Sequence, residues 1–187
     1  DALEIYGNPV VDATLRPISD PADSQSPWVQ RGLDLSAANQ RMLVPGQAKF
    51  ALSSWTVEAW AKPGIDATVG ERMAIVRRAV ADIGQTDEVL NYEIGLLGRT
   101  LAGIVVWTPY VRFTDFADTS QELCAPFGVA KDQWAQVTAS LDAISGKLLL
   151  YVNGYLVGES EGDYRDVDCV VYGGDEAEVT IGGGALM

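Results

Sequence analysis

The chain has 187 residues, of which 48% are hydrophobic and 21% charged; this suits one globular domain and excludes global disorder. Its formal net charge is −13, and no basic cluster larger than Arg77-Arg78 stands out, so nucleic-acid binding through phosphates is disfavoured. The apolar runs have the length of strands rather than of membrane spans, so we expect no membrane insertion.

The amino-terminal part, residues 1–31, shows little regular patterning. Short edge strands are expected at 3–6 and 10–11, and the proline-containing segment 17–27 is typical of a loop. We expect one domain over residues 1–187, with its motifs in 32–184, that forms part of a larger protein.

Strand patterns recur through the middle of the chain. Residues 54–62 alternate, which places Trp55 on one face and Trp60 among polar neighbours on the other, either on an open concave surface or beneath another layer. Residues 91–97 and 101–107 predict a hairpin that turns at 98–100. Residues 73–76 predict a strand, with one helical turn over 77–82. Long acidic loops are expected at 114–127 and 162–168.

The clearest pattern is a three-stranded meander within residues 134–158. Apolar and polar residues alternate over 136–141, as a half-buried strand requires. Turn residues at 142–146 lead to a second strand at 147–152, and Asn153-Gly154 is typical of a type I′ turn before a third strand at 155–157. With a last short strand at 178–181, these patterns indicate an all-β antiparallel protein.

The order of the motifs resembles the laminin G-like domains of the concanavalin A-like jelly-roll group. The matching segments are GLDL at 32–35, WTVEAWAKP at 55–63, YEIGL at 92–96, WAQV at 134–137, LYVNG at 150–154 and IGG at 181–183. The resemblance implies two curved antiparallel sheets packed face to face, with long loops at one rim. Members usually carry a further strand or two after the IGG segment; either residues 3–11 or another chain or domain fills that place, or the end is disordered or cut.

Catalysis is disfavoured by the residue types that the chain contains. It has no histidine, so it has neither Ser-His-Asp nor Cys-His machinery. Glycosidases of the same fold carry paired carboxylates on one strand in a Glu-x-Asp-x-x-Glu pattern, and the sequence contains no such strand. We therefore expect a protein that is not an enzyme.

The resemblance implies a calcium ion at the loop rim, held by two side chains and main-chain carbonyls. The corresponding positions fall on Asn91 and Asp175, with Glu176 one residue away. Asp87 and Glu88 would add the charge that Asn91 lacks. The alternative is that Asn91 and Asp175 cap ordinary turns.

A second candidate site is an aromatic platform for a sugar, because pyranose rings have apolar faces that stack on aromatic rings. The candidates are Trp107, Tyr110 and Phe113, next to Asp115 and Asp118 of the acidic loop. The alternative for each of these rings is packing in the core. Trp55 and Trp134 begin regular strands and are assigned to the core.

The two cysteines, Cys124 and Cys169, lie 45 positions apart. Two thiols without a histidine make a poor zinc site, so a disulfide between them is predicted, with two buried free thiols as the alternative. A disulfide would indicate an oxidising compartment and a secreted or cell-surface protein.

The function that the sequence favours is that of a non-catalytic extracellular recognition or adhesion module, which binds a glycan or a protein and is assisted by calcium. The alternative is a structural or assembly domain, which packs against neighbouring domains or self-associates through an open sheet edge. A glycoside hydrolase on the same fold is the third reading.

Overall fold

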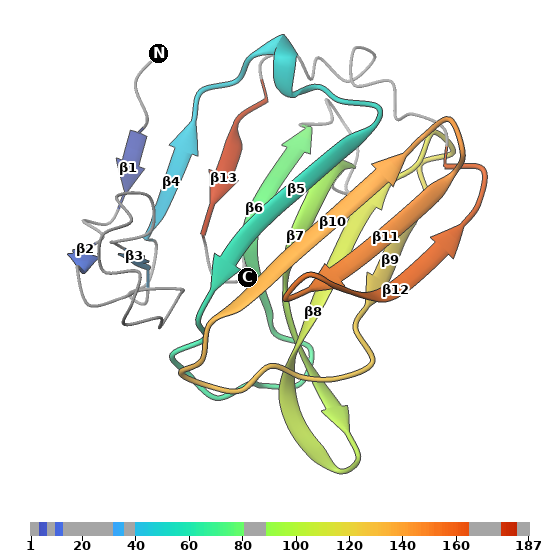
Figure 1. The fold of residues 1–187 in the computed structure, drawn as a ribbon. Helices are drawn as coiled ribbons and strands as arrows, with labels where there is room; N and C mark the ends of the chain where they lie inside the picture. Colours follow the sequence, from blue (N-terminus) through green and yellow to red (C-terminus); the bar gives the residue numbers. More distant parts are fainter. Residues whose placement is uncertain are drawn as a thin grey trace.

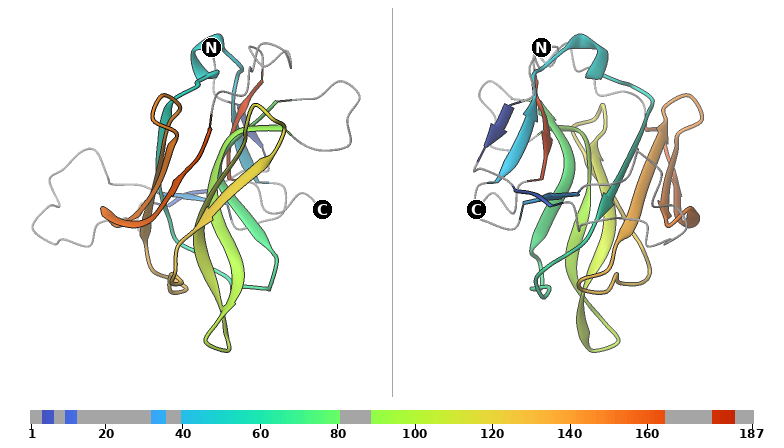
Figure 2. Two further views of the ribbon diagram at one scale, coloured as in Figure 1. Left: turned by 90° about the vertical axis from the view of Figure 1, so that its right-hand side faces the viewer. Right: turned by 60° about the vertical axis from the view of Figure 1, so that its left-hand side comes forward.

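Two antiparallel sheets stack face to face in the computed structural model, which describes residues 4–6, 10–12, 32–35, 40–80, 89–164 and 177–182 (Figures 1 and 2). The larger sheet has the order β1-β4-β13-β6-β7-β8-β9 and the smaller β12-β11-β10-β5, while β2 and β3 form a separate pair. The predicted all-β, two-sheet jelly-roll sandwich is therefore confirmed. No helix among the described residues is long and apolar enough to span a membrane.

The strands of the seven-stranded sheet are β1 (Glu4–Tyr6), β4 (Arg41–Val44), β13 (Val179–Ile181), β6 (Arg72–Val80), β7 (Val89–Leu101), β8 (Ile104–Thr114) and β9 (Ser120–Cys124). Those of the four-stranded sheet are β12 (Tyr155–Glu161), β11 (Lys147–Val152), β10 (Ala135–Asp142) and β5 (Trp55–Ala61). The remaining elements are β2 (Val10–Asp12), β3 (Gly32–Asp34) and a short 3-10 turn, η2 (Ala48–Phe50).

The core lies between the two sheets, and strand alternation builds it. Every second residue of β10 and β11 is buried there, and the inward residues of β7 and β8 meet them from the other sheet. Phe113 packs edge-on against Trp55 and Tyr164, with ring centroids 6.2 and 5.4 Å apart. Trp55 is thus in the core as predicted. Trp134 is only half-buried and instead lies beneath Lys62, whose Nζ is 5.9 Å from the ring centroid.

The two turns of the meander follow the sequence. Asn153 and Gly154 have φ of 51° and 79°, as the predicted type I′ turn requires. At the other turn, the Asp142 carboxylate accepts hydrogen bonds from the Ile144 amide at 3.0 Å and the Ser145 hydroxyl at 2.7 Å. The meander strands are β10, β11 and β12, which pair as expected.

The β7–β8 hairpin turns at Ala102-Gly103, with φ of 50° and 82°, rather than at the predicted residues 98–100. Gly98 lies inside β7, and a larger residue would not fit there because the chain at Thr68 passes directly over it: an added Cβ would overlap the Thr68 carbonyl oxygen. Here glycine permits close backbone approach and does not mark a turn. The hairpin is correspondingly longer than predicted.

Two further expectations about local structure were wrong. β6 runs as a strand to Val80, so no helical turn forms over 77–80, because these residues pair with β7 through a register shift between Arg78 and Ala79. The expected loop at 114–127 contains β9, whose residues pair with β8 from Tyr110↔Cys124 to Thr114↔Ser120. Sheet pairing overrides the weak local propensity in both segments.

β13 is an interior strand of the seven-stranded sheet. It pairs with β4 on one side and with β6 on the other, and β1 then adds to the far side of β4. β1 is therefore the outermost strand beyond β4, so residues 4–6 extend this sheet, whereas β2 pairs with β3.

Candidate functional site

Four arginines lie on the outer face of the seven-stranded sheet, the face turned away from the core. They are Arg72 and Arg77 on β6, Arg99 on β7 and Arg112 on β8, and strand register brings them together with Glu93, Tyr110 and Glu122. On β7 and β8 the alternate residues, such as Ile94 and Val111, point into the core. We call this surface the arginine face.

Glu93 is the centre of the arginine face and is 1% exposed. Its carboxylate accepts hydrogen bonds from Arg112 at both oxygens, from Nε at 2.7 Å and from Nη2 at 3.1 Å. Arg77 Nε lies 3.3 Å from Glu93 Oε2 on the opposite side. Bidentate arginine–carboxylate pairs of this kind are strong and hold both side chains in one geometry.

These contacts change the acidities of the groups around Glu93. Burial is the largest single influence on the pKa of Arg112, and it lowers that pKa. The hydrogen bonds and the charge of Glu93 together outweigh burial, so the pKa of Arg112 is raised. Burial lowers the pKa of Arg77, although the Glu93 charge opposes it. Both guanidiniums keep their charge at neutral pH, because the ordinary pKa of an arginine side chain is far above it.

Tyr110 is fully buried although it belongs to the outer face. Its hydroxyl donates a hydrogen bond to Glu93 Oε1, and its ring lies over Gly95, where an added Cβ would come within 2.8 Å of Tyr110 Cε1. Burial raises the pKa of the Tyr110 hydroxyl, and the Glu93 charge raises it further. The hydroxyl is therefore a hydrogen-bond donor at any physiological pH.

Arg72 lies above Tyr110, and its guanidinium carbon is 4.9 Å from the centre of the ring. Its Nη2 forms an ion pair with Glu122 Oε2 at 2.6 Å. Two buried polar atoms of this face, Arg72 Nη1 and Thr108 Oγ1, have no hydrogen-bond partner within the described residues. Buried donors of this kind normally bind water or a ligand.

The predicted aromatic platform of Trp107, Tyr110 and Phe113 is buried. The rings are therefore packed inside the protein, which was the alternative to an exposed sugar-binding surface. Trp107 is 2% exposed and donates from Nε1 to the Ile65 carbonyl at 2.9 Å, and Phe113 is 2% exposed within the aromatic core. Tyr110 points to the opposite face from these two. Both faces of β8 carry an aromatic ring, so its sequence does not separate an exposed ring from a buried one.

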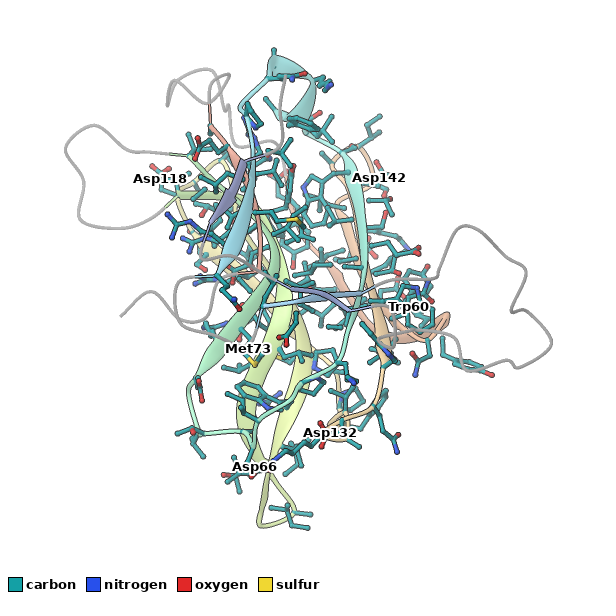
Figure 3. The ribbon with its side chains drawn as sticks, turned by 90° about the vertical axis from the view of Figure 1, so that its left-hand side faces the viewer. Trp60, Asp66, Met73, Asp118, Asp132 and Asp142 are labelled. Atoms are coloured by element: carbon teal, nitrogen blue, oxygen red, sulfur yellow. The ribbon has the colours of Figure 1, made fainter. Side chains whose placement is uncertain are left out.

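The acidic residues beside that platform belong to the turn between β8 and β9. Asp115 is 7% exposed, and its carboxylate accepts hydrogen bonds from the Ala117 and Thr119 amides and from Gln121 Nε2. Asp118 is exposed, with φ of 56°. It lies on the opposite side of the sandwich from Trp60 (Figure 3). Asp115 therefore stabilises a turn.

Asn91 is committed to protein contacts and does not fit a calcium ligand. Its Oδ1 accepts a hydrogen bond from Arg78 Nη1 at 3.0 Å, and its Nδ2 donates to the Leu52 carbonyl at 2.9 Å. A guanidinium on the oxygen that would bind the metal repels a divalent cation. Asp175 and Glu176 lie outside the described residues, as do Asp87 and Glu88. Within the described part of the chain, no three Cys, Asp or Glu side chains are grouped as metal ligands.

Cys124 carries a free thiol in the structure, and its predicted disulfide partner, Cys169, lies outside the described residues. The Cys124 thiol is 3.5 Å from Glu122 Oε1 at the edge of the arginine face. Burial and the Glu122 charge raise the pKa of the Cys124 thiol to about 11. The thiol is therefore protonated and weakly nucleophilic at neutral pH.

Trp60 lies on the outer face of the four-stranded sheet and is half-buried (Figure 3). Its cross-strand partner is Gln136, which donates from Nε2 to Glu58 Oε1 at 2.8 Å. Of the two locations expected for Trp60, the structure shows the outer sheet surface. The described residues of this face form no buried charge network like that of the arginine face.

The family of the chain follows from this sandwich and from sequence comparison. The laminin G-type family model of the concanavalin A-like lectin/glucanases superfamily matches residues 36–184. The chain belongs to this superfamily. A search of curated protein sequences found no significant match.

Several solved structures resemble this chain in fold. The CBM40 of the Ruminococcus gnavus IT-sialidase bound to alpha2,3 sialyllactose has a TM-score of 0.50 and 15% identity, and covers 70% of this chain; the chain spans 64% of that structure. A SAP-like pentraxin from Limulus polyphemus has a TM-score of 0.47 and 17% identity; the alignment covers 75% of this chain and 55% of the pentraxin chain. Alginate lyase PA1167 from Pseudomonas aeruginosa has a TM-score of 0.49 and 13% identity; the alignment covers 82% of this chain and 68% of the lyase chain.

The superfamily, as its description states, contains both lectins and glucanases, that is, binding proteins and enzymes. A shared sandwich does not by itself assign an activity, which depends on the residues placed on it. In this chain the arginine face is the site that sequence patterns missed, because only Arg77-Arg78 stood out as a basic pair. The sequence signal for this site is an arginine at outward positions of β6, β7 and β8, which lie far apart in the sequence.

Proposed function

We propose that the protein is a non-catalytic extracellular recognition module that binds glycans on the arginine face. The observation that carries this proposal is the buried Glu93 network, which fixes Arg77, Arg112 and Tyr110 on an outer sheet surface. Sugar recognition requires polar groups held in fixed positions, since each immobilised hydroxyl must regain the hydrogen bonds that it made to water. Membership of a lectin and glucanase superfamily supports the same class of ligand.

Binding is favoured over hydrolysis by the state of the carboxylates on this face. A glycosidase needs one carboxyl group as acid and a second as nucleophile or base, about 5–10 Å apart across the sugar. The two acids described here are already engaged: Glu93 with Arg77, Arg112 and Tyr110, and Glu122 with Arg72. Neither matches a catalytic pair waiting for a substrate.

The test is a glycan array followed by calorimetry with the purified chain. We expect a subset of glycans to bind, and the variant Arg72→Gln to lower affinity at least tenfold. Lys147→Gln is the matched control, because it removes an exposed ion pair with Glu159 on the other sheet and should leave affinity unchanged. Turnover of a bound glycan, or a folded protein that binds none, would contradict the proposal.

The structural or assembly role has one specific observation in its favour. Edge strand β12 exposes Tyr155 by 77% and Leu156 by 51%, and an apolar edge invites strand addition. If this edge drives assembly, light scattering should show concentration-dependent oligomers that Leu156→Lys disrupts. A monomer that binds glycans would argue against this role.

A further inference from the structure

The sequence contains a single Asn-Gly dipeptide, Asn153-Gly154, and it forms the turn between β11 and β12. The other three asparagines precede Pro9, Gln40 and Tyr92. A glycine after an asparagine leaves the intervening peptide nitrogen open to reaction, because glycine has no Cβ to shield it. Asn153 and Gly154 are both exposed to solvent. This turn is therefore the place in the sequence where an asparagine side chain is best able to react with its own main chain.

The side-chain carbonyl of Asn153 is held by the neighbouring strand β10. Its Oδ1 accepts a hydrogen bond from the Gln136 amide at 2.9 Å, and the Asn153 amide donates to the Gln136 carbonyl at 2.9 Å. The side-chain oxygen thus continues the β10–β11 ladder one step beyond the pair Val137↔Val152. A donor on this oxygen polarises the carbonyl and stabilises the negative charge that develops there when a nucleophile adds to Cγ.

The groups that would attack and leave are not engaged elsewhere. Among the residues that the structure describes, neither the Gly154 amide nor Asn153 Nδ2 has a hydrogen-bond partner. Apart from its chain neighbours, nothing lies within 4 Å of the position of a Cβ on Gly154. β12 is the outer strand of its sheet and pairs with β11 alone, so movement of this turn disturbs an edge and not the core.

We propose that Asn153-Gly154 is a site of deamidation, and that its isoaspartyl product releases the half of β12 next to the turn. The Gly154 nitrogen loses its proton to hydroxide and bonds to Asn153 Cγ. The Cγ–Nδ2 bond then breaks, and the amide leaves as ammonia with a proton from water, which closes a succinimide ring. Water opens the ring at the bond to Cγ to give aspartate, or at the bond to the main-chain carbonyl carbon to give isoaspartate.

The two products affect the turn differently. Aspartate leaves the main chain unchanged, tolerates the φ of 51° at this position, and offers a carboxylate to the Gln136 amide in place of the amide oxygen. Isoaspartate routes the main chain through the side chain of residue 153 and so adds one carbon to a two-residue turn. The type I′ geometry, which fits the twist of the flanking strands, is then lost.

The half of β12 next to the turn depends on that geometry. Only two residue pairs join β11 to β12 between the turn and the register shift of this ladder, whereas four pairs join the other half. The two pairs are Tyr151↔Leu156 and Val152↔Tyr155, and the four run from Lys147↔Glu161 to Leu150↔Gly158. Tyr155 and Leu156 are 77% and 51% exposed, so packing adds little to hold them. Distortion of the turn should therefore free residues 155–157 and leave 159–161 paired.

The modification is tested by incubating the purified full chain at 37 °C between pH 6 and 9 and following every asparagine by peptide mass spectrometry. We expect Asn153 to deamidate at least tenfold faster than any other asparagine. The rate should rise with pH, because the Gly154 nitrogen reacts only after it has lost its proton. Conversion of Asn153 no faster than that of the others, or at a rate that does not rise with pH, would overturn the proposed site.

Hydrogen exchange of the separated products tests the effect on β12. We expect the isoaspartyl form to exchange the amides of residues 155–157 at least tenfold faster than the variant Asn153→Asp, with 159–161 unchanged. Asn153→Asp is the matched control, because it carries the same added charge without the extra main-chain carbon, and its urea midpoint should equal that of the original chain. Equal exchange in the two forms would overturn the release of β12.

Discussion

At the scale of single residues, the carboxylate of Glu93 is the anchor of the arginine face. It is almost inaccessible, yet its partners Arg77 and Arg112 still reach solvent with part of their side chains. Removing its charge would take from Arg77 and Arg112 the carboxylate that they share, and from the Tyr110 hydroxyl its charged acceptor. Loss of one partner from a buried ion pair is costly, because the remaining charge stays desolvated.

We expect Glu93→Gln to lower the free energy of unfolding by about 3 kcal/mol. Glu122→Gln is the matched control, because its pair with Arg72 is about one-third exposed and should be worth less than about 1 kcal/mol. Urea denaturation of both variants measures the difference. Equal losses would show that the Glu93 network does not hold the sheet.

The raised pKa values of the Cys124 thiol and the Tyr110 hydroxyl lead us to expect that the protein loses stability in alkali. Both have folded-state pKa values raised by burial, to about 11 for Cys124 from its ordinary 9.0. A raised pKa means that the folded state binds the proton more tightly, so stability is fully present below about pH 9 and declines as pH rises to 11. Urea midpoints between pH 8 and 11 should fall, and less steeply in Cys124→Ala. A flat profile would refute the assignment.

At the scale of elements, Gly98 lies inside β7, where the chain at Thr68 approaches it closely. The β7–β8 hairpin continues past Gly98 to a turn at Ala102-Gly103. This length also places Arg99 on the sheet, next to Val106 of β8, where a turn at 98–100 would have put it at a loop tip. The site thus depends on a glycine that carries no chemistry itself.

We expect Gly98→Ala to destabilise the protein by about 3 kcal/mol, because the new Cβ would collide with backbone atoms that cannot rotate away. Gly64→Ala should be close to neutral, because nothing lies within 4 Å of its added Cβ. Thermal unfolding of the two variants compares them. A tolerated Gly98→Ala would mean that the 65–71 segment moves freely from the sheet.

At the scale of the whole molecule, the sandwich was predictable where alternation was regular. β10 and β11 bury every second residue, and Asn153-Gly154 has the backbone conformation of its predicted turn, so the meander followed from local rules. The arginine face was not predictable in this way. Arg72, Arg99 and Arg112 come from three strands, and only the pairing register, which no local pattern specifies, sets them side by side.

The interior position of β13 has a consequence for biosynthesis. β4 and β6 are made early, but neither can complete its native pairing until Val179–Ile181 has left the ribosome and entered between them. β6, β7, β8 and β9 can meanwhile assemble as consecutive hairpins, which already contain the Glu93 network. The arginine face can therefore form during translation, while closure of the sheet waits for β13.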